Sequence, residues 1–169
     1  MERIKPEPAA DERVMLEQYL DFQRATLLLK TAGLSAAQLA TTVAPSSLTL
    51  AGLLKHAALN EHSWIWERFC GNPEDDYWAV VDWDADPDWE FRTATDDYPE
   101  VLRERYRAEI ERGRAAIAGA AADDLSVGLN RKGNRMTLRW ILLHMIEETS
   151  RHLGHADYLR EAIDGQTGE

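Results

Sequence analysis

Apolar residues recur every three to four positions in four long stretches of the chain, which is the spacing that places them on one face of an α-helix. One stretch, for example, carries Leu102, Tyr106, Ile110 and Ile117 at this spacing. No segment shows the strict alternation of apolar and polar residues that is typical of a β-strand. The pattern therefore predicts four long helices, over about 11–32, 49–70, 97–117 and 136–164.

Capping residues mark the ends of these predicted helices. Thr49 is suited to begin the second helix, and Pro99 falls in the first turn of the third. Glycines stand where the first, second and fourth helices should stop, at 33, 71 and 165. Four helices joined in sequence predict an all-α, up-down four-helix bundle, and we expect residues 1–169 to form a single domain.

The segment between the second and third predicted helices, from 72 to about 95, lacks helical periodicity. It is rich in acidic residues and contains Trp78, Trp83 and Trp89. We therefore expect a long acidic loop, and loops of this length within compact domains are often functional. The tryptophans either cover the mouth of the bundle and shape a substrate cleft, or simply seal the edge of the core.

The composition disfavours several classes of function and one cellular destination. The chain has 19 Lys and Arg residues against 30 Asp and Glu residues, and this formal net charge of -11 disfavours binding to nucleic acids and to anionic membranes. The single cysteine, Cys70, cannot form an internal disulfide, and the first residues lack the apolar stretch of a secretory signal. We expect a cytoplasmic protein.

The last predicted helix carries a polar band on a face that is otherwise apolar. His144, Glu148, His152 and His155 all fall within an arc of about 80° at the rotation of an α-helix. Apolar residues precede and follow them on the same arc, so this face should point into the bundle. Buried polar groups need partners, and the band therefore calls for a specific explanation.

A divalent metal is one such explanation. Glu148 and His152 are one turn apart, and a third ligand from another helix would complete a site of the kind found within helical bundles. His56, beside the apolar stripe of the second helix, is the natural candidate. Two nitrogens and one carboxylate oxygen suit zinc first, with nickel and ferrous iron as alternatives. The competing interpretation is that Glu148 and His152 form a hydrogen-bonded pair, or that these histidines are ordinary core residues, with no metal.

Two segments resemble a known family. "SLTLAGLLKHAALNEHSW" and "LRWILLHMIEETSRHLGHADYLREAIDGQTGE" are similar to the DinB and YfiT-like superfamily, in its mycothiol-transferase-like branch. The resemblance extends from about Leu20 to the end of the chain, and implies an up-down four-helix bundle with a metal held by His56, Glu148 and His152. Many relatives have histidine in place of Glu148, whereas the mycothiol-dependent maleylpyruvate isomerase offers glutamate.

The resemblance also implies roles for neighbouring residues. His144 and His155 would lie behind the ligands or face the substrate. Apart from the resemblance, Arg139, Arg24 and Glu61 are candidates for the pocket, and each also fits an exposed or helix-pairing role. Cys70 lies too far along its helix from His56 to join the metal site.

The expected function is that of a metal-dependent thiol S-transferase or isomerase, in which mycothiol is the cosubstrate and a small electrophile is the substrate. His56, Glu148 and His152 would act in catalysis through the metal. The alternative is a non-catalytic, stress-related bundle that binds metal as a binding or sensing protein. The sequence leaves the oligomeric state open, with a homodimer as one expectation.

Overall fold

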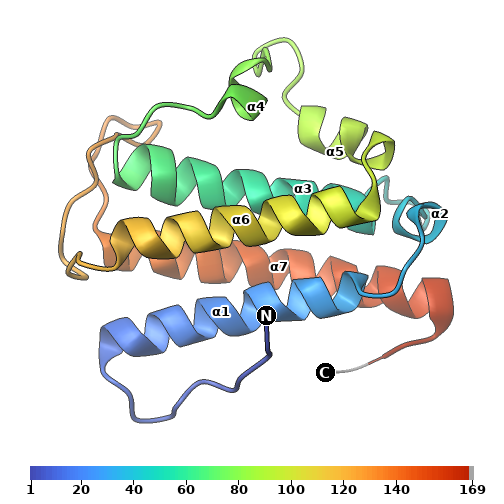
Figure 1. Cartoon of the computed structure of the whole chain (residues 1–169), viewed down its shortest axis with the longest axis horizontal. Helices are drawn as coiled ribbons and strands as arrows, with labels where there is room; N and C mark the ends of the chain where they lie inside the picture. Colours follow the sequence, from blue (N-terminus) through green and yellow to red (C-terminus); the bar gives the residue numbers. More distant parts are fainter. Residues whose placement is uncertain (168–169) are drawn as a thin grey trace.

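Four long helices lie side by side in the computed structural model, which describes residues 1–167 (Figure 1). No β-strand occurs among these residues, and the predicted all-α bundle is confirmed. The long helices are α1 (Glu12–Thr31), α3 (Leu50–Glu61) with its continuation η1 (His62–Phe69), α6 (Pro99–Ile117) and α7 (Leu138–Asp164).

The helix boundaries follow the capping signals closely. The Thr49 side chain accepts a hydrogen bond from the backbone N–H of Gly52, and so satisfies a free donor in the first turn of α3. At the other end of the chain, α7 stops at Gly165, whose φ of 76° lies in the left-handed region that glycine adopts without steric cost. Both predicted boundaries are confirmed.

The helices pack in pairs, α1 mainly against α7 and α3 mainly against α6. The predicted inner face of α6 is confirmed, because Leu102, Tyr106, Ile110 and Ile117 are all buried. The α3 helix also contacts α7, and these two helices bring together the polar residues that the sequence singled out. Removal of apolar side chains from water along these faces is the main force that holds the bundle together.

The second long helix changes its geometry halfway. Its first part is α-helical, but η1 is a π-helix, in which a backbone N–H bonds the carbonyl five residues earlier, as Cys70 does to Ile65. Each π-helical turn holds more residues than an α-helical turn, so side chains after Glu61 point in directions that a continuous α-helix would not give them. The predicted helix exists to its end, but its second half is π-helical.

The segment expected as a loop contains short helical elements, α4 (Asp76–Ala79), α5 (Trp89–Thr93) and the 3₁₀ turn η2 (Ala94–Asp96), and another short helix, α2 (Ala36–Leu39), follows α1. Helix α5 packs on α3 (Figure 1). The buried Lys55 ammonium donates hydrogen bonds to Thr93 and Asp97 and lies 4.2 Å from the centre of the Trp89 ring. These contacts fix the segment against α3 just beside His56.

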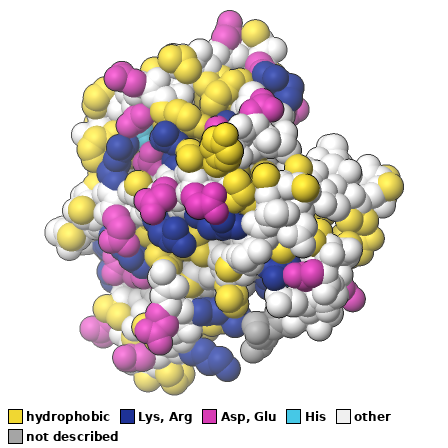
Figure 2. Space-filling model, turned by 45° about the vertical axis from the view of Figure 1, so that its right-hand side comes forward, with side chains coloured by type: hydrophobic (Ala, Val, Ile, Leu, Met, Phe, Trp, Pro, Cys, Tyr) yellow, Lys and Arg dark blue, Asp and Glu magenta, His cyan; other side chains and the backbone are white. Residues whose placement is uncertain are grey.

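None of the helices formed by residues 1–167 is both long and apolar enough to cross a membrane. On the face of the molecule shown in Figure 2, acidic and basic side chains are interspersed, and they do not separate into one large patch of either sign.

Candidate metal centre

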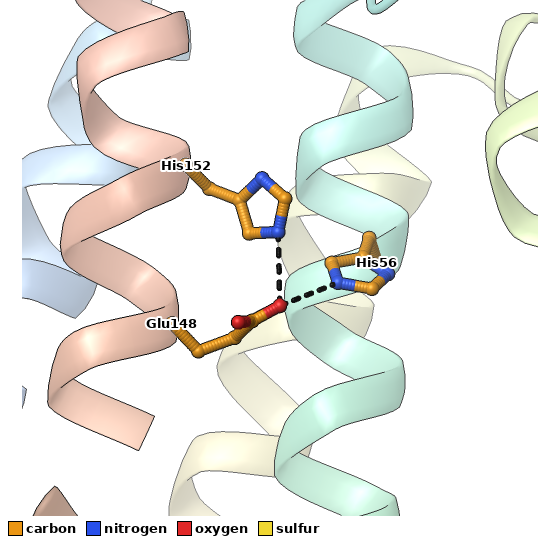
Figure 3. A group of neighbouring side chains, drawn as sticks. All are labelled: His56, Glu148 and His152. Atoms are coloured by element: carbon orange, nitrogen blue, oxygen red, sulfur yellow. Dashed lines mark hydrogen bonds and ion pairs between the residues drawn. The ribbon is translucent and has the colours of Figure 1, made fainter. Parts of the chain in front are cut away.

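His56 of α3 faces Glu148 and His152 of α7 across the interior of the bundle (Figure 3). One ligand atom from each residue can be chosen so that all three lie within 4.8 Å of one another. The Oε1 atom of Glu148 lies 3.1 Å from His152 Nε2 and 3.5 Å from His56 Nε2. The pairing within α7 follows from the separation of four residues, which places both side chains on one helix face.

The contacts of His56 position its ring and favour one neutral tautomer. Nδ1 lies 2.9 Å from Oε1 of Glu90, a carboxylate that can only accept, so Nδ1 carries the proton. The side-chain amide of Asn60 lies 3.0 Å from Nε2, where it donates to the free lone pair. The Phe91 ring stacks on the imidazole with a centroid separation of 4.7 Å and fixes its plane. His56 therefore presents a nitrogen lone pair toward α7.

The protonation of His56 decides the character of its contact with Glu148. His56 Nε2 and the Glu148 carboxylate face each other at 3.5 Å, so a protonated ring donates to the carboxylate, whereas a neutral ring with its proton on Nδ1 places two acceptors against each other. A cation between them would turn this repulsive contact into an attractive one. The carboxylate of Glu90 behind His56 is the arrangement that commonly orients histidine ligands of metals. The donor set and its surroundings thus fit a divalent transition metal.

The protonation states also suit metal ligands. Burial would raise the pKa of Glu148, but interactions with His152 and His56 outweigh it and hold that pKa below its ordinary value. Burial and the neighbouring charge of His56 lower the pKa of His152, although Glu148 acts in the opposite direction. At neutral pH the carboxylate is therefore ionised and the imidazole is neutral, as metal coordination requires.

His152 lacks the support that His56 receives. Its Nδ1 atom is buried and has no hydrogen-bond partner among residues 1–167. In the absence of a cation, Nε2–H can donate to Glu148, and Nδ1 then keeps an unused lone pair. The two histidines are therefore inequivalent, since one ring is fixed by a carboxylate and the other is fixed mainly by packing.

A cleft of about 490 Å³ opens beside His56 and Glu90. Its walls come from α3, η1, the acidic segment and the loop before α7, and they include Trp64 and Trp83. Of the three tryptophans of the acidic segment, Trp83 lines this cleft, whereas Trp78 is fully buried in the core. The lining is mostly polar, which suits a hydroxylated small molecule better than a lipid.

The other predicted site residues lie at various distances from the cluster. The His155 ring is 5.9 Å from the His152 ring, but its residue is exposed. His144 instead contacts the rings of Trp64 and Trp140, at centroid separations of 4.5 and 5.1 Å. The structure brings neither histidine to the three ligand candidates.

Arg139 does not reach the cluster either. Its guanidinium pairs with Glu12 and Asp123 at the start of α7, nine residues or about 13 Å along the helix axis from Glu148. These two carboxylates hold the arginine at the end of the bundle, which matches the helix-pairing alternative for this residue. Arg24 and Glu61 form a buried ion pair with each other, and Glu61 lies close behind the cluster beside Asn60.

Glu90 and Asn60 are the residues that sequence reasoning missed. Glu90 lies in the acidic segment, where no periodicity indicates which of many carboxylates turns inward. Asn60 could have been found, because it stands one helical turn after His56 and a polar side chain on that face needs a partner.

The fold and these residues define a class, a four-helix bundle with a half-buried His, Glu and His cluster between two helices. The family model for mycothiol S-transferases matches residues 15–165. The chain therefore belongs to this family, which is DinB-like, and the resemblance inferred from the two quoted segments is confirmed. Comparison with curated proteins gave no match.

Proposed function

We propose that this protein is a metal-dependent mycothiol S-transferase or isomerase, in which His56, Glu148 and His152 hold a divalent metal. Zinc is the metal that we favour, and nickel and ferrous iron are alternatives with the same ligand preferences. The observation that carries the proposal is the convergence of three ligand atoms within 4.8 Å from two facing helices, beside a polar cleft. Membership of the mycothiol S-transferase family supports the thiol as cosubstrate.

A metal bound at this cluster would supply positive charge that favours the thiolate form of the cosubstrate. The chain itself contributes position and shape. Glu90 and Phe91 hold the His56 ring with its lone pair toward α7, and the cleft leaves room for both a thiol and an electrophile. The thiolate sulfur would then attack an electrophilic carbon that the cleft holds nearby.

The protein's own cysteine is a poor alternative nucleophile. Cys70 stands at the C-terminal end of η1, fourteen residues after His56 in the sequence, and does not line the cleft. Burial raises the pKa of its thiol, which lowers the thiolate fraction at neutral pH. The reacting sulfur would therefore arrive with the cosubstrate.

The metal centre can be tested directly by calorimetric titration of the metal-free protein with Zn²⁺. We expect one equivalent to bind, and we expect His56→Ala and His152→Ala each to abolish stoichiometric binding while the helical circular dichroism is retained. His144→Ala is the matched control, since that histidine contacts Trp64 and Trp140 rather than the cluster. Full zinc occupancy in both cluster variants would show that the metal site is assigned to the wrong residues.

A further inference from the structure

Two arginines face the same cleft as the candidate metal centre. Arg68 belongs to η1, and Arg131 belongs to the loop that precedes α7. Both residues line the cleft together with His56, although they come from distant parts of the sequence. Backbone hydrogen bonds fix the loop to the end of η1, where the N–H of Gly128 donates to the Arg68 carbonyl at 2.8 Å. The fold thus holds the two cations at one end of the cleft.

The Arg68 side chain folds back along its own helix toward the metal centre. Its Nη1 donates to the Ser63 carbonyl at 3.2 Å, and its guanidinium carbon lies 4.7 Å from the centre of the Trp64 ring. These contacts place the guanidinium near the level of residue 63, seven residues from His56, or about 10 Å along the helix axis. Among residues 1–167, the Ser63 carbonyl is the one hydrogen-bond partner of this guanidinium, which has five N–H donors.

Neither guanidinium has a carboxylate partner among residues 1–167, because no acidic oxygen of these residues lies within 4.0 Å of Arg68 or Arg131. Burial and the nearby charge of Arg131 lower the pKa of Arg68, and only the charge of Glu67 opposes this shift. An anion between the two arginines would relieve their mutual repulsion within the cleft.

The acidic residues of the cleft do not fill this role, because each has another partner. Glu67 pairs with His62 at 3.5 Å, and Glu74 accepts a hydrogen bond from the Trp83 indole N–H at 3.4 Å. Glu90 holds His56 at 2.9 Å. The positive end of the cleft is therefore left for a ligand.

We propose that Arg68 and Arg131 bind a carboxylate of the electrophilic substrate, so that its reactive carbon lies toward the metal centre. The identification of this anion as part of the electrophile rests on the proposed function. The binding of an anion by the two arginines does not depend on that function. Guanidinium groups bind carboxylates in a planar, two-point geometry, and the Trp64 and Trp83 rings would flank a flat substrate.

The test compares two probes that differ only in charge, 4-chloro-3-nitrobenzoate and its primary amide, by calorimetric titration of the metal-loaded protein. We expect the carboxylate to bind about tenfold more tightly than the amide, because a hydrogen-bonded charge pair contributes about 1.5 kcal/mol or more. Arg68→Met and Arg131→Met should each remove most of this preference and leave the amide affinity unchanged. Arg107→Met is the matched control, since that arginine is exposed on α6 and lies outside the cleft.

Equal affinity for the two probes, or equal effects of the cleft variants and Arg107→Met, would overturn the proposal. Arg131→Met keeps the test decisive even if Arg68→Met unfolds, because Arg131 is exposed and makes no buried contact. A turnover assay with mycothiol is a separate readout, in which the sulfur bonds the ring carbon, chloride leaves with its electron pair and the thiol proton goes to solvent. Carboxylate-selective binding without turnover would support the anion site and contradict the transferase function.

Discussion

Two buried polar groups lie within about two turns of each other in this bundle, and they are built on opposite principles. Arg24 of α1 and Glu61 of α3 form a closed pair, with Nε to Oε1 at 2.7 Å and Nη2 to Oε2 at 2.5 Å. Each side chain is at most 3 % exposed. In the candidate metal cluster, by contrast, His56 and Glu148 are 3.5 Å apart and present two acceptors to each other when the His56 ring is neutral, and the Nδ1 atom of His152 has no partner in the described chain.

The difference shows which group holds the bundle and which is available for chemistry. The Arg24 and Glu61 charges neutralise each other, and the pair leaves no coordinating atom free. The cluster is half-buried and next to a cleft, and its three ligand atoms lie close enough together to share one cation. Substitutions should therefore separate the two groups, so that changes in the closed pair alter stability and changes in the cluster alter metal binding.

The largest effect should come from breaking the closed pair. Arg24→Met leaves the Glu61 carboxylate buried without its partner, and we expect the free energy of unfolding to fall by about 3–5 kcal/mol in urea titrations. The double variant Arg24→Met with Glu61→Leu should recover most of this loss, because it leaves no buried charge. Equal stability of the single and double variants would mean that the pair is not what holds these helices together.

A second closed group, His62 with Glu109 and Glu67, should make stability depend on pH. Burial would lower the pKa of His62, and the Asp75 N–H at 3.3 Å from Nε2 also favours the neutral ring, but the two carboxylates raise this pKa to about 9. The folded state then binds the proton more tightly than the unfolded state, so the stabilisation is complete below pH 6.5 and is lost as the pH rises through 9.

The measurement is the free energy of unfolding between pH 6 and pH 10, for which one proton allows a slope of at most about 1.4 kcal/mol per pH unit. The wild type should lose stability over this range, and His62→Gln should show a smaller loss. If both proteins have the same pH profile, His62 is not protonated in the folded state.

In the candidate metal cluster, Glu148→Gln should weaken zinc binding without loss of the fold. The amide has nearly the same volume as the carboxylate, but it lacks the charge that attracts the ion. We expect the zinc dissociation constant to rise by about a hundredfold, measured by competition with a chelator at neutral pH. Unchanged affinity would remove Glu148 from the ligand set.

The smallest effect should come from the residue behind His56. Glu90→Gln keeps a side chain of the same shape but removes the charge that polarises the His56 ring, and we expect zinc affinity to fall by about tenfold. Glu74→Gln is the control, since that glutamate lines the same cleft but does not contact a histidine. Equal zinc affinities in the two variants would argue that Glu90 only fills space.

The sequence predicted the bundle well because apolar spacing and capping residues are local signals. Thr49, Pro99 and Gly165 mark real helix boundaries, and the polar band of the last helix led to Glu148 and His152. His155 was placed on the inner arc by the helical wheel and is nevertheless exposed, because the neighbouring helices cover only part of that arc.

Features that depend on tertiary contacts could not be predicted in the same way. The π-helical geometry after Glu61 changes the direction of each later side chain, and no residue type in "HSWIWERF" specifies it. The inward turn of Glu90 depends on the packing of α5 against α3. The ion pairs of Arg139 with Glu12 and Asp123 could not be predicted, because these partners lie far away in sequence or in a turn.

Thiol-dependent consumption of an electrophile tests the central claim most directly. The assay combines the zinc-loaded protein, mycothiol and 4-chloro-3-nitrobenzoate, and compares the wild type with Cys70→Ala and His152→Ala. We expect the wild type and Cys70→Ala to consume the electrophile at equal rates, only when both zinc and mycothiol are present, and we expect His152→Ala to be inactive while it keeps the helical fold. Retained activity in His152→Ala with loss in Cys70→Ala would contradict the account and move the chemistry to the protein's own sulfur.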